Sequence, residues 1–217
     1  MKSLLNKEFR LAASPLSYGF LAGSLMTLLP GYPILMSAFF VCMGIFQSFQ
    51  NARESNDVLY TLLLPVPKRD LVRGKFAFTC AIQLIGFVLC AALTVLRMTA
   101  LSGALAYTAN ALLNATPVYL AFWLLICAAF NLLFVGGFFK TAQKLGGPFL
   151  HFSIAAFVLV GIAETLPHLP GLGFLHTPSG ERLGLQLAVL AAAAAAYAAV
   201  TWAACRASEK RMERIDF

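Results

Sequence analysis

Charged residues are scarce in this chain. Only 12% of its 217 residues are Asp, Glu, Lys or Arg, whereas 60% are hydrophobic, and the mean hydropathy is +0.80. So few polar side chains cannot cover the surface of a water-soluble domain. The composition therefore excludes a soluble globular protein and indicates an integral membrane protein.

Catalytic motifs are also missing. The sequence contains no H-E-x-x-H zinc motif, no G-x-S-x-G nucleophile turn and no cluster of aspartates for magnesium. A phosphate-binding loop needs G-x-x-x-x-G-K-[ST], but the Gly74-Lys75 pair precedes Phe76 and lacks the upstream glycine. We therefore predict no catalytic residue, no metal and no cofactor in this chain. ATP and magnesium, where they are needed, would be bound by a partner chain.

Cysteine and histidine are few and widely spaced. The five cysteines lie within apolar segments, without the close spacing of a zinc or redox pair. His168 and His176 lie in a Pro- and Gly-rich loop at residues 167–182, with no cysteine nearby. We interpret the cysteines as apolar packing residues and the loop as a shaped outer segment. A basic strip interleaved with aromatic residues is absent, so a nucleic-acid partner is not predicted.

Long apolar runs dominate what is present. An α-helix needs roughly 20 residues to cross a hydrocarbon core of about 30 Å. The sequence predicts an all-α polytopic membrane protein, a single transmembrane domain over residues 1–217. Its six predicted spans are residues 16–29, 32–49, 76–96, 115–139, 148–166 and 183–205. The first two are short, and Pro30-Gly31-Tyr32-Pro33 between them predicts a helical hairpin.

Positive charge is distributed unevenly over the predicted loops. All of the 16 Lys and Arg residues except Arg97 and Arg182 fall on the side of the two termini. Because Lys and Arg are retained in cytoplasmic loops, we expect both termini in the cytoplasm and the chain in the cell membrane. Residues 1–14 predict an amphipathic helix in the inner headgroup region. Arg97, near an outer helix end, is expected to extend to water.

The longest polar interruption is residues 51–75. Asn51, followed three residues later by Glu54, predicts the N-terminus of a short helix. Arg53 and Asp57 are one turn apart and could pair, and prolines from Pro65 onward force a stop. We therefore predict that this loop forms a rigid element at the membrane surface. The alternative prediction is that this helix only rests on the lipid surface.

Small and polar residues inside the spans predict helix packing. Residues spaced four apart allow the close approach of another helix, within the subunit or across a dimer: Gly19 and Gly23 in the first span, and Ala188, Ala192 and Ala196 in the last. Gln83 and Asn131 are uncharged polar residues within spans. Leaving such groups unpaired in a bilayer is costly, so we expect interhelical hydrogen bonds there.

Several short motifs in the first 75 residues resemble one known family. They are Lys7-Glu8-Phe9-Arg10, Pro30-Gly31-Tyr32-Pro33, Arg53-Glu54 with Asp57 and Tyr60, Leu63-Leu64-Pro65-Val66, and Lys68-Arg69-Asp70 ending at Lys75. Together they resemble six-span permease subunits of ABC-2 type transporters. They are most similar to the small permeases of bacterial exporters for antimicrobial, lantibiotic-like or phenol-soluble modulin-like peptides. Beyond residue 75 the resemblance is one of span number and topology.

The resemblance implies a partner and a docking site. In that family the first cytoplasmic loop carries a coupling helix that sits in a groove of the ATPase, and two permeases work with two ATPases. The chain would then bind an ABC ATPase, a second permease copy or a related permease, the lipid bilayer and a peptide or amphipathic cargo. The implied ATPase-docking residues are Arg53, Glu54, Asp57, Val58, Leu59, Tyr60, Leu62, Leu63, Pro65, Lys68, Arg69 and Asp70.

Two other functions stay open at this point. An ATP-independent channel or secondary transporter would be expected to carry charge within its spans, and these spans are nearly uncharged. A membrane assembly protein would fit the hydrophobic pattern equally well, but it leaves the organised first loop without a role. The preferred prediction is a permease subunit of an ATP-driven exporter without its own enzymatic activity.

Overall fold

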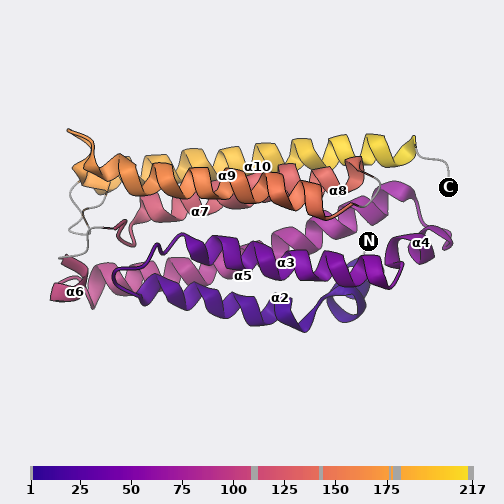
Figure 1. Cartoon of the computed structure of the whole chain (residues 1–217), viewed down its shortest axis with the longest axis horizontal. Coiled ribbons are helices and arrows are strands. Elements are labelled where there is room, and N and C mark those ends of the chain that lie inside the picture. Colours follow the sequence, from indigo (N-terminus) through magenta and orange to yellow (C-terminus); the bar gives the residue numbers. More distant parts are fainter. Residues whose placement is uncertain (1, 109–111, 142–143, 176, 178–181, 215–217) are drawn as a thin grey trace.

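The protein forms an elongated bundle of helices. The computed structural model describes residues 2–108, 112–141, 144–175, 177 and 182–214, and no strand occurs among them. Helix α4 lies at one end of the bundle with both chain termini, and α6 lies at the opposite end (Figure 1). We refer to these as the α4 end and the α6 end. An all-α fold was predicted, and the described residues confirm it.

The first half of the described chain contains three long helical segments, at residues 15–28, 36–54 and 68–99, together with several shorter helices. Its elements are α1 (Lys2–Lys7), the π-helix η1 (Glu8–Ala12), α2 (Pro15–Gly19), the 3-10 helix η2 (Phe20–Leu28), α3 (Met36–Glu54), α4 (Asp57–Leu62), α5 (Lys68–Thr99) and α6 (Leu105–Thr108). The hairpin predicted at residues 30–33 joins η2 to α3, and Gly31 supplies a positive φ of 71° in its turn.

The second half returns along the bundle three times. Its elements are α7 (Pro117–Ala129), the π-helix η3 (Phe130–Val135), α8 (Gly136–Lys140), α9 (Gly146–Thr165), the 3-10 helices η4 (Leu166–His168) and η5 (Gly173–Leu175), and α10 (Leu183–Glu213). The predicted outer loop at residues 167–182 contains η5, but its His176 lies outside the described residues. Helix α10 continues beyond Cys205, where the last predicted span ends, as far as Glu213.

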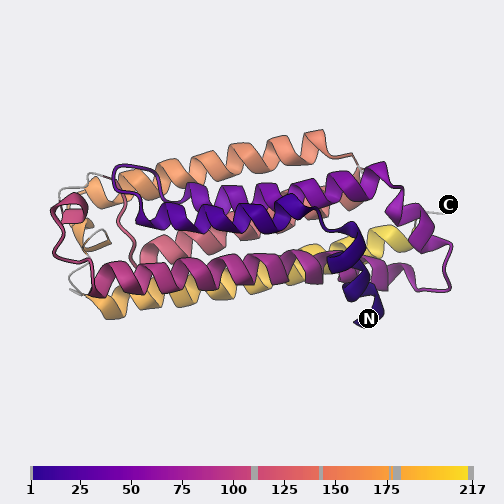
Figure 2. The same cartoon turned by 90° about the horizontal axis from the view of Figure 1, so that it is seen from below.

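Four of the predicted spans are confirmed by length and composition. Among the described residues, the helices long and apolar enough to cross a membrane are Lys68–Thr99, Pro117–Lys140, Gly146–His168 and Leu183–Glu213. The first two predicted spans are not among them, because residues 15–28 are divided between α2 and η2, and α3 carries polar residues in its last turns. They run parallel to the long helices (Figures 1 and 2). Six spans therefore remain a prediction.

The chain between α3 and α4 differs from the prediction. Helix α3 continues through Asn51, so the expectation that a helix begins there is wrong. The break comes at Asn56, whose left-handed conformation (φ 51°, ψ 31°) interrupts the helix before α4 begins at Asp57. Asparagine adopts this conformation more readily than most residues. The stop at Pro65 was predicted, and α4 indeed ends at Leu62.

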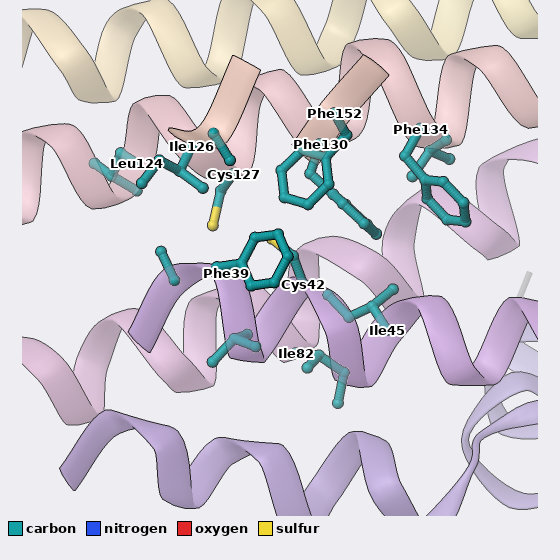
Figure 3. Close-up of a cluster of buried hydrophobic side chains, with 14 of the residues drawn as sticks. Phe39, Cys42, Ile45, Ile82, Leu124, Ile126, Cys127, Phe130, Phe134 and Phe152 are labelled. Atoms are coloured by element: carbon teal, nitrogen blue, oxygen red, sulfur yellow. The ribbon is translucent and has the colours of Figure 1, made fainter. Parts of the chain in front are cut away.

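Phenylalanine is the most frequent residue type in the core. Figure 3 shows Phe39 of α3 facing Phe130 of η3 and Phe152 of α9, with Phe134 of η3 farther along the bundle. The rings of Phe130 and Phe152 meet edge to face with their centroids 4.9 Å apart, and those of Phe39 and Phe152 stack at 5.7 Å. Such pairs add about 0.5–1.5 kcal/mol each to the burial of their apolar area.

Burial is unequal between the spans. The most apolar stretch of the helix from Pro117 to Lys140 is 72% buried, whereas those of α9 and α10 are 17% and 11% buried. The α7 helix thus lies at the centre of the bundle, and α10 covers one side of it, next to α5 (Figure 2). Most of the surface of α9 and α10 is left for lipid or another chain.

Candidate functional site

A network of four charged side chains fixes α4 to the bundle. The Lys75 ammonium of α5 lies 2.6 Å from Glu8 Oε2 and 2.9 Å from Asp57 Oδ2. The Lys7 ammonium lies 2.7 Å from Asp57 Oδ1, and it donates a hydrogen bond to Thr61 Oγ1 at 2.6 Å. Lys7 is the last residue of α1 and Glu8 the first of η1, and we call these two continuous elements the N-terminal helix. Asp57 and Thr61 come from α4, and Lys75 comes from α5. The network therefore joins three elements that are distant in sequence.

The surroundings of Asp57 in this network favour its ionised form. Lys75 and Glu8 are almost fully buried, with exposed fractions of 2% and 3%. Partial burial acts to raise the pKa of Asp57, but the charges and hydrogen bonds of Lys75 and Lys7 outweigh it, so the pKa lies below its ordinary value. Removing one member of a buried pair leaves an uncompensated charge. The four side chains therefore act as one structural unit.

A second set of ion pairs holds α5 against the end of α10. Arg73 donates from Nε to Glu209 Oε1 at 2.8 Å, and Arg69 pairs with Glu213. Glu209 is largely buried, with a side-chain exposure of 6%. The 31-residue α10 is roughly 46 Å long at 1.5 Å per residue, so it reaches well past a core of about 30 Å. These pairs fix the position at which the loop enters α5.

The outward surface formed by α4 and the two residues that follow it is apolar. Leu59 is 48% exposed, Tyr60 65%, Leu63 76% and Leu64 52%. We call these four residues the α4 patch. On the opposite side of α4, Val58 is only 1% exposed and packs in the hydrophobic core. The helix is therefore held by one face and presents large apolar side chains on the other, at the extreme end of the bundle (Figure 1).

The predicted docking residues divide into two groups. An exposed group can reach a partner directly: Arg53, Glu54, Leu59, Tyr60, Leu63, Pro65 and Arg69. The others are partly or fully covered within the chain: Asp57, Val58, Leu62, Lys68 and Asp70. The pairing expected between Arg53 and Asp57 is not formed among the described residues, because Asp57 is engaged by Lys7 and Lys75. Their role toward an ATPase stays a prediction.

Sequence reasoning missed the inner side of this site. Lys7 and Lys75 were counted among the charges on the side of the two termini, yet both bind the Asp57 carboxylate of the predicted coupling helix, and Glu8 pairs with Lys75. A lysine such as Lys75, directly before the apolar residues of a span and one helical turn above Thr79, was a possible signal for an internal partner. Its partners are 67 and 18 residues away in sequence, which no local pattern indicates.

The predicted packing glycines and alanines lie in different surroundings. A Cβ on Gly23 would lie 3.1 Å from Phe40 Cβ, so this glycine packs within the subunit, whereas Gly19 faces open space. Ala188 and Ala192 are exposed, and Ala196 is half-buried. Helices α2 and α3 approach each other closely at Gly44, which the sequence analysis did not select. A Cβ there would lie 2.9 Å from Phe20 Cβ and 3.1 Å from Ser17 Cα.

Arg97 behaves differently from the expectation. It was expected to extend to water, but only 4% of it is exposed. Its guanidinium donates to the Thr27 carbonyl at 2.7 Å and to Asn114 Oδ1 at 3.1 Å, and it lies 4.1 Å from the centroid of the Tyr107 ring. These contacts satisfy the cation inside the protein. Arg97 thus ties η2, α5 and α6 together at the α6 end.

The hydrogen bonds expected of Gln83 and Asn131 are confirmed. The two side-chain amides exchange hydrogen bonds of 3.0 and 3.1 Å between α5 and η3. Asn131 also donates to Thr201 Oγ1 at 2.9 Å, and Tyr197 donates to Gln83 Oε1 at 2.8 Å, which adds α10. Gln83 and Tyr197 line a largely apolar cavity of about 570 Å³ between α5, α7 and α10, together with Trp123.

Comparison with known families gives one finding. The sequence model of the family described as "ABC-2 family transporter protein" matches residues 3–199. Comparisons with curated proteins and with solved structures give no match. The match includes α4, the charged network, three of the helices that are long enough to span a membrane and the first part of α10. It does not distinguish the peptide-exporter subtype, which stays a prediction. The chain belongs to the ABC-2 transporter family and is a membrane protein of that family.

Proposed function

We propose that this chain is a permease subunit of an ATP-driven ABC transporter and that α4 is its coupling helix. Family membership implies an ABC ATPase partner in general. The observation that carries the assignment to α4 is its two-sided environment. Its inner face is bound to α5 and the N-terminal helix, while the α4 patch offers apolar side chains at the end of the bundle. An apolar helix face of this kind fits a groove on a partner.

Motion of α4 would reach the membrane helices through the charged network. ATP binding and hydrolysis in the partner would displace α4, and Asp57 would carry this displacement to Lys75 in α5. Lys7 and Glu8 would carry it to the N-terminal helix. The phenylalanine core would then pass the movement on as a shift of packed helices, since close-packed interiors deform little. The α4 end would face the cytoplasm in this arrangement.

The cargo we propose is an amphipathic or antimicrobial peptide that is exported through a dimer of permeases. The cavity between α5, α7 and α10 supports this, because apolar walls are combined with Gln83 and Tyr197. Within the described part of the chain, the buried indole N–H of Trp123, which also lines the cavity, has no hydrogen-bond acceptor. A peptide carbonyl could satisfy such a donor. The exposed apolar surface of α10 suits the second permease copy.

The test is co-purification of the full-length chain with its cognate ATPase from membranes. The variant Tyr60→Ala/Leu63→Ala removes two side chains of the α4 patch that are exposed in the isolated chain. If these side chains are anchors in the interface, each costs about 2 kcal/mol or more on truncation, and we expect association to fall at least a hundredfold. Permease-stimulated ATP hydrolysis should fall in parallel.

A matched control is available at the opposite end of the bundle. Leu105 is 84% exposed and Leu169 is 54% exposed, and both lie at the α6 end. The variant Leu105→Ala/Leu169→Ala removes similar apolar area and should bind the ATPase as the wild type does. Equal association of both double variants with the ATPase would refute the assignment of α4.

A further inference from the structure

A second groove lies near the α4 end, on the side of the bundle away from the α4 patch. It has a volume of about 590 Å³ and lies between the η3–α8 segment, the start of α9 and the end of α10. Its apolar wall is formed by Leu132, Leu133, Pro148, Ala203, Ala204 and Ala207. The groove opens beside the exposed surfaces of α9 and α10, so lipid could enter it from a surrounding membrane.

The mouth of the groove carries positive charge. Lys140 is the last residue of α8, His151 lies near the start of α9 and Arg211 lies near the end of α10, and all three line the groove. The residues known to line it include no Asp or Glu. His151 has one ring nitrogen, Nδ1, at 2.7 Å from the Gly147 carbonyl, so its Nε2 is directed elsewhere. The charges converge where the helices end.

These cations differ from those around α4. Lys7, Lys75, Arg69 and Arg73 all pair with carboxylates of the chain. Within the part of the chain that the structure describes, neither Lys140 nor Arg211 has such an ion pair. Arg211 instead donates one hydrogen bond, to the Gly136 carbonyl at 3.3 Å, which anchors its guanidinium at the groove. A guanidinium has five N–H donors, so this anchor leaves donors for an anion.

We propose that this groove binds an anionic phospholipid of the leaflet at the α4 end. The phosphate would lie between Lys140 and Arg211, and one acyl chain would lie along Leu132, Ala203 and Ala207. Basic pockets between membrane helices suit anionic headgroups, because the cations meet the phosphate where the apolar wall meets the acyl chain. The small side chains of α10 leave room for that chain. The site is separate from the α4 patch and does not depend on an ATPase.

The experiment is native mass spectrometry of the full-length chain, titrated with dioleoyl phosphatidylglycerol and, separately, with dioleoyl phosphatidylcholine. We expect the wild type to prefer phosphatidylglycerol. The variant Lys140→Gln/Arg211→Gln should weaken phosphatidylglycerol binding by about thirtyfold, which corresponds to about 1 kcal/mol for each cation near a lipid surface. Binding of phosphatidylcholine should be unchanged.

Two further variants distinguish a specific lipid-binding site from a general attraction of anionic lipid to positive charge. Lys144→Gln/Lys210→Gln removes the same net charge from lysines that are close in sequence but are not among the residues lining the groove, and it should keep the preference. Ala207→Phe changes no charge but fills the apolar part of the groove, and it should weaken binding of phosphatidylglycerol. Equal losses in the two charge variants, full binding by the Ala207 variant, or no preference in the wild type would each overturn the proposal.

Discussion

Lys75 of α5 holds Asp57 of α4 at 2.9 Å from within the protein. The lysine is 2% exposed, so its charge depends on Asp57 and Glu8 for compensation. This pair is the direct connection between the helix that we assign to coupling and the first of the four long membrane helices. Its strength therefore determines both how firmly α4 is held and how directly its movement is passed on.

A double-mutant cycle measures this pair. Lys75→Met leaves two carboxylates facing only Lys7 and should destabilise the protein by about 3 kcal/mol, which is roughly 6–12 °C in unfolding temperature for a chain of this size. Asp57→Asn should cost less, because Lys75 keeps Glu8. The two changes should couple by about 1–3 kcal/mol. Thermal unfolding followed through reaction of the buried thiols of Cys42, Cys90 and Cys127 supplies the measurement.

The control for the cycle is Lys210→Met. Lys210 is exposed near the end of α10, and substitutions at such positions change stability by less than about 0.5 kcal/mol. Additive effects of the Lys75 and Asp57 variants would show that the pair contributes no specific energy.

The stability of the network should depend on pH in one direction. The folded-state pKa of Asp57 lies below its ordinary value of 3.8. A carboxyl with a lowered pKa stabilises the fold fully above its unfolded pKa and loses this contribution as the pH falls through the folded pKa. The contribution should therefore be constant between pH 7 and 5, begin to fall near pH 4, and be lost as the pH drops through the folded pKa.

The difference in unfolding temperature between the wild type and Asp57→Asn, measured from pH 7 down to 3, isolates this contribution. It should stay constant at first and shrink at the acid end. A difference that already shrinks between pH 7 and 5 would mean that Asp57 titrates above its ordinary range.

The close approach at Gly44 predicts an intolerant position. Gly44→Ala places a Cβ within 3.1 Å of the Ser17 backbone, which cannot move without shifting α2, and we expect a loss of about 1–3 kcal/mol. Gly19→Ala is the matched control, because it meets open space and lies at the end of a helix. The Gly19 variant should unfold no earlier than the wild type. Equal destabilisation by both variants would contradict the packing of α2 against α3.

The hydrogen-bonded side chains of Gln83 and Asn131 predict a graded loss of stability in two variants. Asn131→Leu removes the partner of Gln83 and the donor to Thr201, and it should cost about 1–2 kcal/mol. Thr201→Val removes one acceptor and should cost about half as much. Unfolding temperatures of the two variants in the same detergent provide the comparison. A larger effect of the Thr201 variant would show that the Gln83 pair contributes little.

Features that depend on local sequence were predictable. The four longest spans follow from their apolar lengths, and the end of α4 follows from Pro65. Gln83 and Asn131 were predicted to bond across helices because a polar group in a span needs a partner, although the sequence did not show that they bond to each other.

Features that depend on the tertiary arrangement were not predictable. Asn56 breaks the helix in a conformation that asparagine adopts more readily than most residues but does not require, so the sequence left the boundary uncertain. The contact of Glu8 with Lys75 spans 67 positions. Arg97 is buried because Thr27, Asn114 and Tyr107 gather around it, and only the folded chain brings them there.

The unequal burial of the helices implies an unequal tolerance to mutation. Any change of size along α7 disturbs neighbours on most sides, since 72% of the most apolar stretch of its span is enclosed. Along α10, where the corresponding fraction is 11%, one hydrophobic residue can replace another outside the few internal contacts without altering the fold of a single chain. Saturation mutagenesis of α10 would therefore report mainly on assembly and lipid contact, and that of α7 mainly on folding.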